Sequence, residues 1–96
     1  MSYFSMKEWG LAGFKKSKVK DKMYAAIIYN KQTKRRRTLN FGSVHYQNFR
    51  DVTGLNLYPH LIHGDKKRRD LFHARHKGFI KEGYYSPSFF SYYFLW

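Results

Sequence analysis

Two runs of cations are the residues whose type and spacing most clearly indicate a chemistry. The first run is Lys34, Arg35, Arg36 and Arg37, and the second is Lys66, Lys67, Arg68 and Arg69. Closely spaced Lys and Arg side chains can contact successive phosphates of a nucleic acid without reading its sequence. We therefore predict polyanion binding at both runs. For the first run, the alternative is an edge strand whose charges prevent aggregation.

The sequence offers little for catalysis or for metal binding. It has no cysteine, and its six acidic residues are scattered among basic ones. Its serines lack the surroundings of a nucleophile elbow, and no glycine-rich loop matches a phosphate-binding motif. His60 with His63, and His73 with His76, have a spacing that suits metal ligands, but the usual cysteine partners of zinc are missing. We predict a protein that is not an enzyme and has no metal, cofactor or small-molecule substrate.

Length and charge narrow the class of protein further. A chain of 96 residues is long enough for one small core. Nineteen Lys and Arg against six Asp and Glu give a net charge of +13, which favours nucleic acid, an acidic protein surface or an anionic membrane surface as partner. No apolar run reaches the roughly 18 to 20 residues of a membrane span. No signal peptide is evident, so we expect the mature chain to be the whole chain.

The second cationic run begins a predicted helix. Asp65 follows Gly64 and can cap the free N–H groups of a helix that runs to about Lys77, with Gly78 as its stop. Steps of three or four residues place a mixed aromatic and cationic set on one face of it. That set is Arg68, Phe72, Arg75, His76 and Phe79. We predict that this helix is the structural hub of the fold, through Asp65, Phe72, Arg75 and His76.

The first cationic run lies on a predicted β-hairpin. Residues 23–29 are apolar and rich in strand formers, and Asn30 is a suitable turn residue before residues 35–41. Alternation in the second strand places Leu39 and Phe41 on one face with Arg35 and Arg37, and Arg36 on the other. The cations therefore lie at the turn and at the start of the returning strand.

The two ends of the chain are rich in aromatic residues. Gly10 and Gly13 interrupt any helix near the N-terminus. We interpret residues 1–22 as an aromatic arm with a basic linker, which needs a partner surface because exposed large apolar side chains are unfavourable. The alternative is that this arm folds back over its own core. The docking residues expected on the arm are Tyr3, Phe4, Trp9 and Phe14.

Ser86 and Pro87 have the types expected at the cap and first position of a helix. The residues that follow are apolar on every side, so we expect this helix to be buried on every side, in this domain or against a neighbour. The docking residues expected here are Phe89, Phe90, Tyr93 and Trp96.

The predicted fold is therefore small α+β. It consists of an N-terminal arm at residues 1–22 and one domain at residues 23–96. The domain contains the β-hairpin, short helices with a central basic helix, and an apolar C-terminal helix.

Three pieces of the sequence together resemble a family of short, basic, uncharacterised proteins of large nucleocytoplasmic DNA viruses. The first piece is the helix pattern made by Asp65, Arg68, Phe72, Arg75 and His76. The second is Phe41 with Gly42 at the end of the hairpin, and the third is Phe90 with Ser91, followed by Leu95 and Trp96. The resemblance covers residues 23–96 and implies a viral source. It supplies no active site, because the family has no established activity.

Two functions fit these features. The first is a virion structural protein, a minor capsid or cement component that docks by its aromatic ends inside a viral shell. The second is a sequence-nonspecific nucleic-acid-binding protein that accompanies the genome. Both place the protein in the virion, and in the host cytoplasm or virus factory during assembly. Exposed aromatic ends favour the first function, whereas a compact monomer that buries them favours the second.

Overall fold

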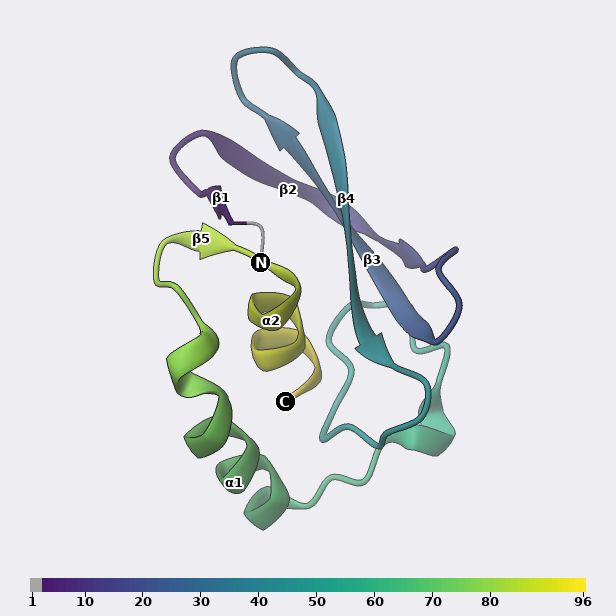
Figure 1. Ribbon diagram of the computed structural model, residues 1–96. Coiled ribbons are helices and arrows are strands. Elements are labelled where there is room, and N and C mark those ends of the chain that lie inside the picture. The colour runs from purple at the N-terminus through teal and green to yellow at the C-terminus, as the bar shows by residue number, and fades with distance from the viewer. Residues whose placement is uncertain (1–2) are drawn as a thin grey trace.

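The computed structural model describes residues 3–96 and confirms a small α+β fold. The main sheet is antiparallel, with strands in the order β2 (Trp9–Lys16), β3 (Lys22–Asn30) and β4 (Arg36–Ser43). In Figure 1, the last helix of the chain lies between this sheet and α1 (Lys66–His76). The sheet, the C-terminal helix and α1 therefore follow one another as layers.

The predicted hairpin is confirmed as β3 and β4, which pair in antiparallel register. Leu39 and Phe41 are the buried positions of β4, as the alternation predicts. Asn30 begins the turn, where its Oδ1 accepts hydrogen bonds from the backbone N–H groups of Gln32 (2.9 Å) and Thr33 (3.0 Å). This side chain replaces the backbone partners that the turn residues lack.

The predicted N-terminal arm is wrong for the part of it that the structure describes, and Met1 and Ser2 lie outside the described residues. β2 pairs with β3 along its length, so the boundary at residue 22 does not separate two units. β1 (Phe4–Ser5) pairs with β5 (Tyr84–Tyr85) and joins the N-terminal part to the C-terminal part of the chain. The alternative, an N-terminal segment that folds back over its own core, is what the structure has.

Gly10 and Gly13, which exclude a helix, both fit into strand β2. Gly10 lies under the ring of Tyr29, and a Cβ at Gly10 would come within 2.6 Å of that ring. The pairing with β3 is irregular between Leu11 and Gly13, where β2 bulges. Glycine is common where a strand bulges or another group approaches closely. We interpreted the glycines as signs of an arm because the sequence alone does not show the strand that β2 pairs with.

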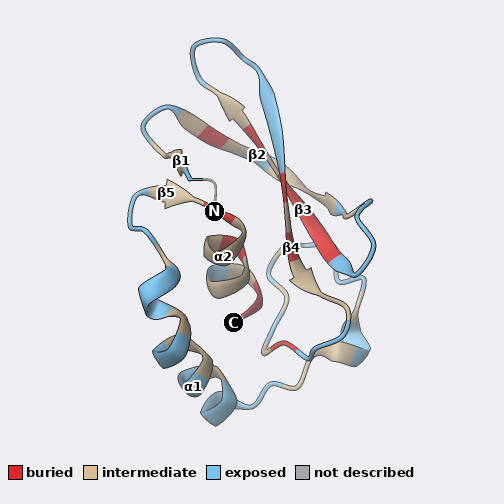
Figure 2. Cartoon of the chain, viewed as in Figure 1, coloured by how far each residue is buried: buried red, intermediate tan, exposed pale blue. Residues whose placement is uncertain are grey.

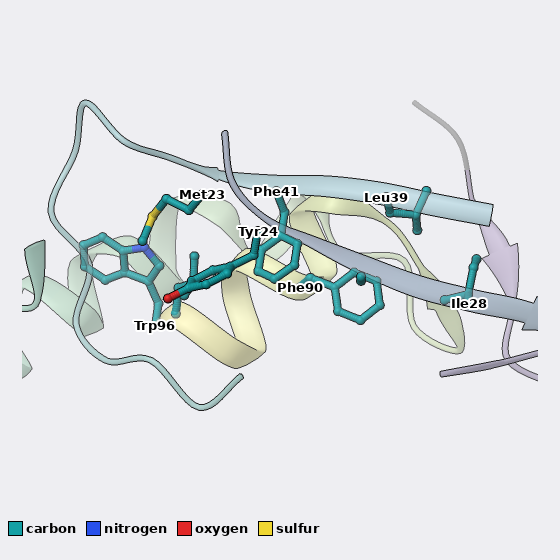
Figure 3. Close-up of a cluster of buried hydrophobic side chains, with 9 residues drawn as sticks. Met23, Tyr24, Ile28, Leu39, Phe41, Phe90 and Trp96 are labelled. Carbon is teal, nitrogen blue, oxygen red and sulfur yellow. The ribbon is translucent and has the colours of Figure 1, made fainter. Parts of the chain in front are cut away.

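The core lies between the main sheet and the C-terminal helix, as the buried segments in Figure 2 show. Its largest fully buried side chains include Tyr24, Phe41, Phe90, Met23, Ile28 and Leu95. Figure 3 shows Phe90 beside Phe41, with Trp96 at the Met23 end of the same cluster. The core is therefore built from residues that are far apart in sequence.

The predicted start of the C-terminal helix is confirmed. Ser86 is the cap, and its side chain accepts a hydrogen bond from the backbone N–H of Phe89 at 3.1 Å. The helix consists of α2 (Pro87–Phe90) and a π-helical turn, Ser91–Leu95, and we call the two together the C-terminal helix. The expectation of burial on every side is wrong at Tyr93, which is 47% exposed. One face of the helix therefore reaches solvent.

A long connection joins β4 to α1 and covers the end of the C-terminal helix. Backbone N–H groups of Phe49 and Arg50 donate to the carbonyl of Leu95 at 3.0 Å each. These bonds satisfy a carbonyl at the end of the helix, where no partner within the helix remains. A 3-10 turn, Pro59–Leu61, lies later in the connection. The connection is therefore tied to the core although it contains no long element.

The predicted Asp65 cap of α1 is confirmed, since its side chain accepts hydrogen bonds from the N–H groups of Lys67 and Arg68. The helix ends at His76 and continues as a 3-10 turn, Lys77–Phe79, so Gly78 lies within that turn and is not the stop. The aromatic seam of α1 packs on the C-terminal helix.

Phe72 makes the central contact of that seam. Its ring stacks between His76, at a centroid distance of 4.0 Å, and Trp96, at 4.2 Å and an interplanar angle of 2°. Because Phe72 is only half-buried, Phe72→Ala should lower the free energy of unfolding by about 2 to 3 kcal/mol, less than a fully buried Phe would lose. Urea unfolding measures this value. The neighbouring Leu71 is 56% exposed, so Leu71→Ala is the control, and equal losses in both variants would contradict the assignment of a hub.

Candidate nucleic-acid interface

The first cationic run forms a fully exposed surface at the tip of the β3–β4 hairpin. We call Lys34, Arg35, Arg36 and Arg37 the hairpin cluster. All of residues 31–38 are exposed, and Figure 2 shows this tip projecting beyond the buried part of the sheet. Arg36 pairs with Tyr29 and Arg37 with Ile28 across the hairpin, so successive side chains point to opposite faces. The cluster can therefore present cations on both sides of a projecting ribbon.

The second cationic run occupies the first turn of α1. We call Lys66, Lys67, Arg68 and Arg69 the helix cluster. Cations at this end oppose the positive end of the helix dipole, and each such charge costs about 0.3 to 1 kcal/mol. No acidic residue follows the Asp65 cap in the first turn to offset them. Helix stability therefore does not explain this cluster.

The structure does not bring the two clusters together. The tip of the hairpin and the first turn of α1 lie at opposite ends of the molecule in Figure 1. The molecule measures 41 × 27 × 20 Å, so its long axis matches about 12 base pairs of duplex at roughly 3.4 Å per pair. The clusters are therefore two separate cationic surfaces at opposite ends of the molecule.

The acidic residues leave these cations largely unneutralised. Asp65 caps α1, Asp51 accepts hydrogen bonds from a buried tyrosine and from a threonine, and Asp21 lies 2.9 Å from a histidine. Over residues 3–96, Arg69 with Asp70 at 3.1 Å is the one ion pair that contains a Lys or Arg. The net charge of +13 is therefore expressed at the surface.

Most of the aromatic residues predicted to dock on a partner pack in the protein's own core instead. Phe90 is fully buried and Trp96 is 9% exposed, so neither offers an exposed ring for docking on a protein surface. The half-buried members of the set lie against the core, and they are Phe4, Trp9, Phe14 and Phe89. Of the predicted docking set, Tyr3 and Tyr93 are exposed, at 37% and 47%. The prediction was wrong for these two residues because other rings of the chain cover them: Phe14 and Phe41 pack on Phe90, and His63 and Phe72 pack on Trp96.

A groove of about 600 Å³ opens between α1, the end of β4 and the C-terminal helix. Arg68, Arg75 and His76 line it from the face of α1 that also carries Phe72. Lys22, at the start of β3, lines it as well. No lining residue among residues 3–96 is acidic. The groove is therefore a cationic cavity with an aromatic wall.

Arg68 and His76 each make a contact that orients their side chains at the groove. Arg68 donates a hydrogen bond from Nη1 to Oε1 of Gln47 at 2.8 Å, which fixes its guanidinium at the edge of the groove. His76 stacks on Phe72, and burial, with the nearby Arg75 charge, lowers the pKa of His76. The imidazole is therefore mostly neutral at pH 7, and the full charges of the groove belong to Arg68, Arg75 and Lys22.

Sequence reasoning identified one wall of this groove and missed the others. Arg68, Phe72, Arg75 and His76 were predicted to share a helix face, which is the wall that α1 contributes. Lys22, Tyr46 and Gln47 were missed, because no local pattern indicates that they meet α1. Most residues that carry the viral resemblance line the groove, namely Phe41, Gly42, Arg68, Phe72, Arg75, His76, Ser91 and Trp96.

Comparison of the chain with models of protein families, with curated proteins and with solved structures finds no match. The resemblance to viral proteins therefore stays a prediction. Among the helices of residues 3–96, none is long and apolar enough to cross a membrane. In the same part of the chain, no three His, Asp or Glu side chains are grouped so that they could hold a metal ion.

Two histidines at the α1 interface predict a loss of stability in acid. Burial is the main reason that the pKa values of His63 and His76 are lowered, and the charges of Arg68 and Arg75 add to it. The unfolded chain takes up protons near pH 6.5 and the folded chain only at lower pH, so the free energy of unfolding falls as pH drops below about 6.5. Urea unfolding from pH 8 to pH 5 measures this trend.

The control for the acid effect is a histidine outside the interface. His60 is exposed, so His60→Gln should keep the pH dependence of wild type, whereas His63→Gln with His76→Gln should flatten it. An unfolding midpoint that stays constant or rises between pH 7 and pH 5.5 would contradict the assignment.

Proposed function

We propose that this protein binds nucleic acid without reading its sequence, through phosphate contacts made by the hairpin cluster and the helix cluster. The observation that carries the proposal is the combination of two cationic clusters, in which only Arg69 forms an ion pair within residues 3–96, with aromatic ends that mostly pack against the protein's own core. A compact chain of this kind has no general need of a protein neighbour to cover its apolar residues. The net charge of +13 is the property that most clearly calls for a partner.

The form of the molecule supports binding to a long polyanion. Two clusters at opposite ends of a molecule 41 Å long can contact phosphates about one helical turn apart, as a duplex offers them. Side chains on a projecting hairpin and on a helix surface reach phosphates without entering a groove to read bases. The expected binding is electrostatic and weakens steeply with salt.

A structural component of a viral shell is the second candidate. The exposed rings of Tyr3 and Tyr93 favour it, because aromatic side chains are enriched at the centres of protein interfaces. An acidic capsid protein would also suit the charge of +13. The burial of Phe90 and Trp96 removes much of the apolar surface that this function requires.

Binding across a salt series tests the proposal. The purified full chain is titrated at several salt concentrations with duplex DNA of about 12 and 24 base pairs and with single strands of the same lengths in nucleotides. Light scattering records the mass of the protein in the same buffers. We expect a monomer for which the logarithm of the binding constant falls linearly with the logarithm of the salt concentration. The slope should be about 0.9 for each duplex phosphate contacted, and its size should correspond to several phosphates. Binding that is weak at low salt, by a protein that aggregates without an acidic protein partner, would favour the shell component.

A further inference from the structure

The groove between α1 and the C-terminal helix has a charge pattern that the two surface clusters do not share. Lys22, Arg68 and Arg75 line one cavity with no acidic residue among the described lining residues. Neither Arg68 nor Arg75 forms an ion pair within residues 3–96. Several full positive charges around one small volume favour a ligand that carries more than one negative charge at a single point.

A phosphomonoester fits this requirement better than a phosphodiester. A monoester carries about −1.5 to −2 charge at pH 7, and three of its oxygens are free to accept hydrogen bonds. Each phosphodiester in the middle of a strand carries only one negative charge. The guanidinium groups of Arg68 and Arg75 can each donate two parallel hydrogen bonds to phosphate oxygens. In a nucleic acid, a phosphomonoester occurs at the end of a strand.

The groove also offers an unoccupied aromatic surface. Phe72 is covered on both faces, by His76 at 4.0 Å and by Trp96 at 4.2 Å, so no base can stack on it. Tyr46 lines the same groove and is 73% exposed. Stacking of a base on an exposed aromatic ring contributes to single-strand binding whatever the base. A volume of about 600 Å³ lies within the range of pockets that hold small organic ligands.

We propose that the groove binds the terminal nucleotide of a nucleic-acid strand, with Arg68 and Arg75 contacting its phosphomonoester and Tyr46 stacking on its base. This proposal rests on the proposed function, since it adds an end-binding site to a protein that binds the rest of the strand by charge. It assigns a specific task to residues outside the hairpin cluster.

Matched oligonucleotides test the site. Single strands of one sequence are prepared with a 5′-phosphate, a 3′-phosphate or hydroxyl groups at both ends, and are titrated against the full chain. We expect at least one phosphorylated form to bind about tenfold more tightly than the hydroxyl form, as one or two charge-assisted hydrogen bonds would give. Arg75→Gln should abolish this preference. Arg36→Gln, on the distant hairpin, should weaken binding of all three strands and leave the preference for a phosphorylated end unchanged.

A mononucleotide separates failure of this site from failure of the proposed function. Thymidine 5′-monophosphate should shift the NMR signals of Tyr46 and Arg75, whereas thymidine should not. Tyr46→Ala should weaken binding of the mononucleotide but not binding of inorganic phosphate. Tight strand binding with no preference for a phosphorylated end would overturn the site and leave the proposed function standing. Shifts from the mononucleotide without strand binding would overturn the proposed function and leave the groove as a site for a nucleotide. Binding of phosphatidic acid vesicles with no response to the mononucleotide would also overturn the site.

Discussion

Replacing Phe90 with alanine is expected to lower the free energy of unfolding by about 3 to 5 kcal/mol, the range for a fully buried Phe. Phe90 is 0% exposed, and its ring contacts other rings on every side. Those rings belong to Phe14, Phe41, Tyr85, Phe89 and Phe94. Domains of this size have only about 5 to 15 kcal/mol of stability in total. We therefore expect the melting temperature to fall by more than about 10 °C.

The matched control is Tyr93→Ala, three residues further along the same helix. Tyr93 is 47% exposed, so its removal should cost less than about 1 kcal/mol. Thermal unfolding of both variants beside wild type makes the comparison. If Phe90→Ala were as stable as Tyr93→Ala, Phe90 would not belong to the core, and the docking role first predicted for it would return.

Replacing Arg35, Arg36 and Arg37 together with alanine is expected to produce the largest loss of binding. All three side chains are exposed and none forms an ion pair within residues 3–96, so the fold should remain intact. Each lost phosphate contact removes about 0.9 from the log-log salt slope on duplex DNA. We expect the slope to fall by roughly 2 to 3, and affinity at about 50 mM salt to fall at least tenfold.

The control for this triple variant retains the charge. Lysine at the same three positions preserves three cations but loses the planar, two-pronged guanidinium. If phosphates are bound mainly by charge, the lysine variant should keep the slope of wild type within about 0.5. An alanine variant with an unchanged slope would show that the hairpin cluster makes no phosphate contact, and we would abandon the electrostatic account.

The helix caps and the hairpin turn could be predicted from the sequence because each depends on neighbouring residues only. Asp65 and Ser86 were predicted as caps because each is a side chain able to accept the free N–H groups of a first turn, and both do so. Asn30 was predicted at the hairpin turn for a similar reason. Gly42 lies near the end of β4 with φ of +76°, and a Cβ there would lie 2.9 Å from Cδ1 of Leu95. The glycine is therefore required both by the backbone and by the C-terminal helix.

Contacts between distant segments were not predictable in the same way. β2 was missed because its glycines fit a strand only beside Tyr29 and a bulge, which the sequence does not reveal. Phe90 and Trp96 were expected to dock on a partner because the segment that carries them is apolar on every side. The protein accommodates them by packing Phe90 against Phe41 of the sheet and Trp96 against Phe72 of α1.

One wall of the groove could be predicted from the sequence, and the opposite wall could not. The α1 wall follows from a spacing of three or four residues. The opposite wall brings Lys22 and Tyr46 to that helix through the course of β3 and the connection after β4. A site shared by several elements requires the tertiary structure, even where one of its walls is visible in the sequence.

The most direct test of the central claim is a map of amide chemical shifts while a short single-stranded oligonucleotide is added to the labelled full chain. The account predicts that perturbations gather at residues 34–37 and 66–69, with a smaller set around the groove, and that they disappear at high salt. Perturbations confined to the surroundings of Tyr3 and Tyr93, with both cationic clusters unaffected, would contradict it.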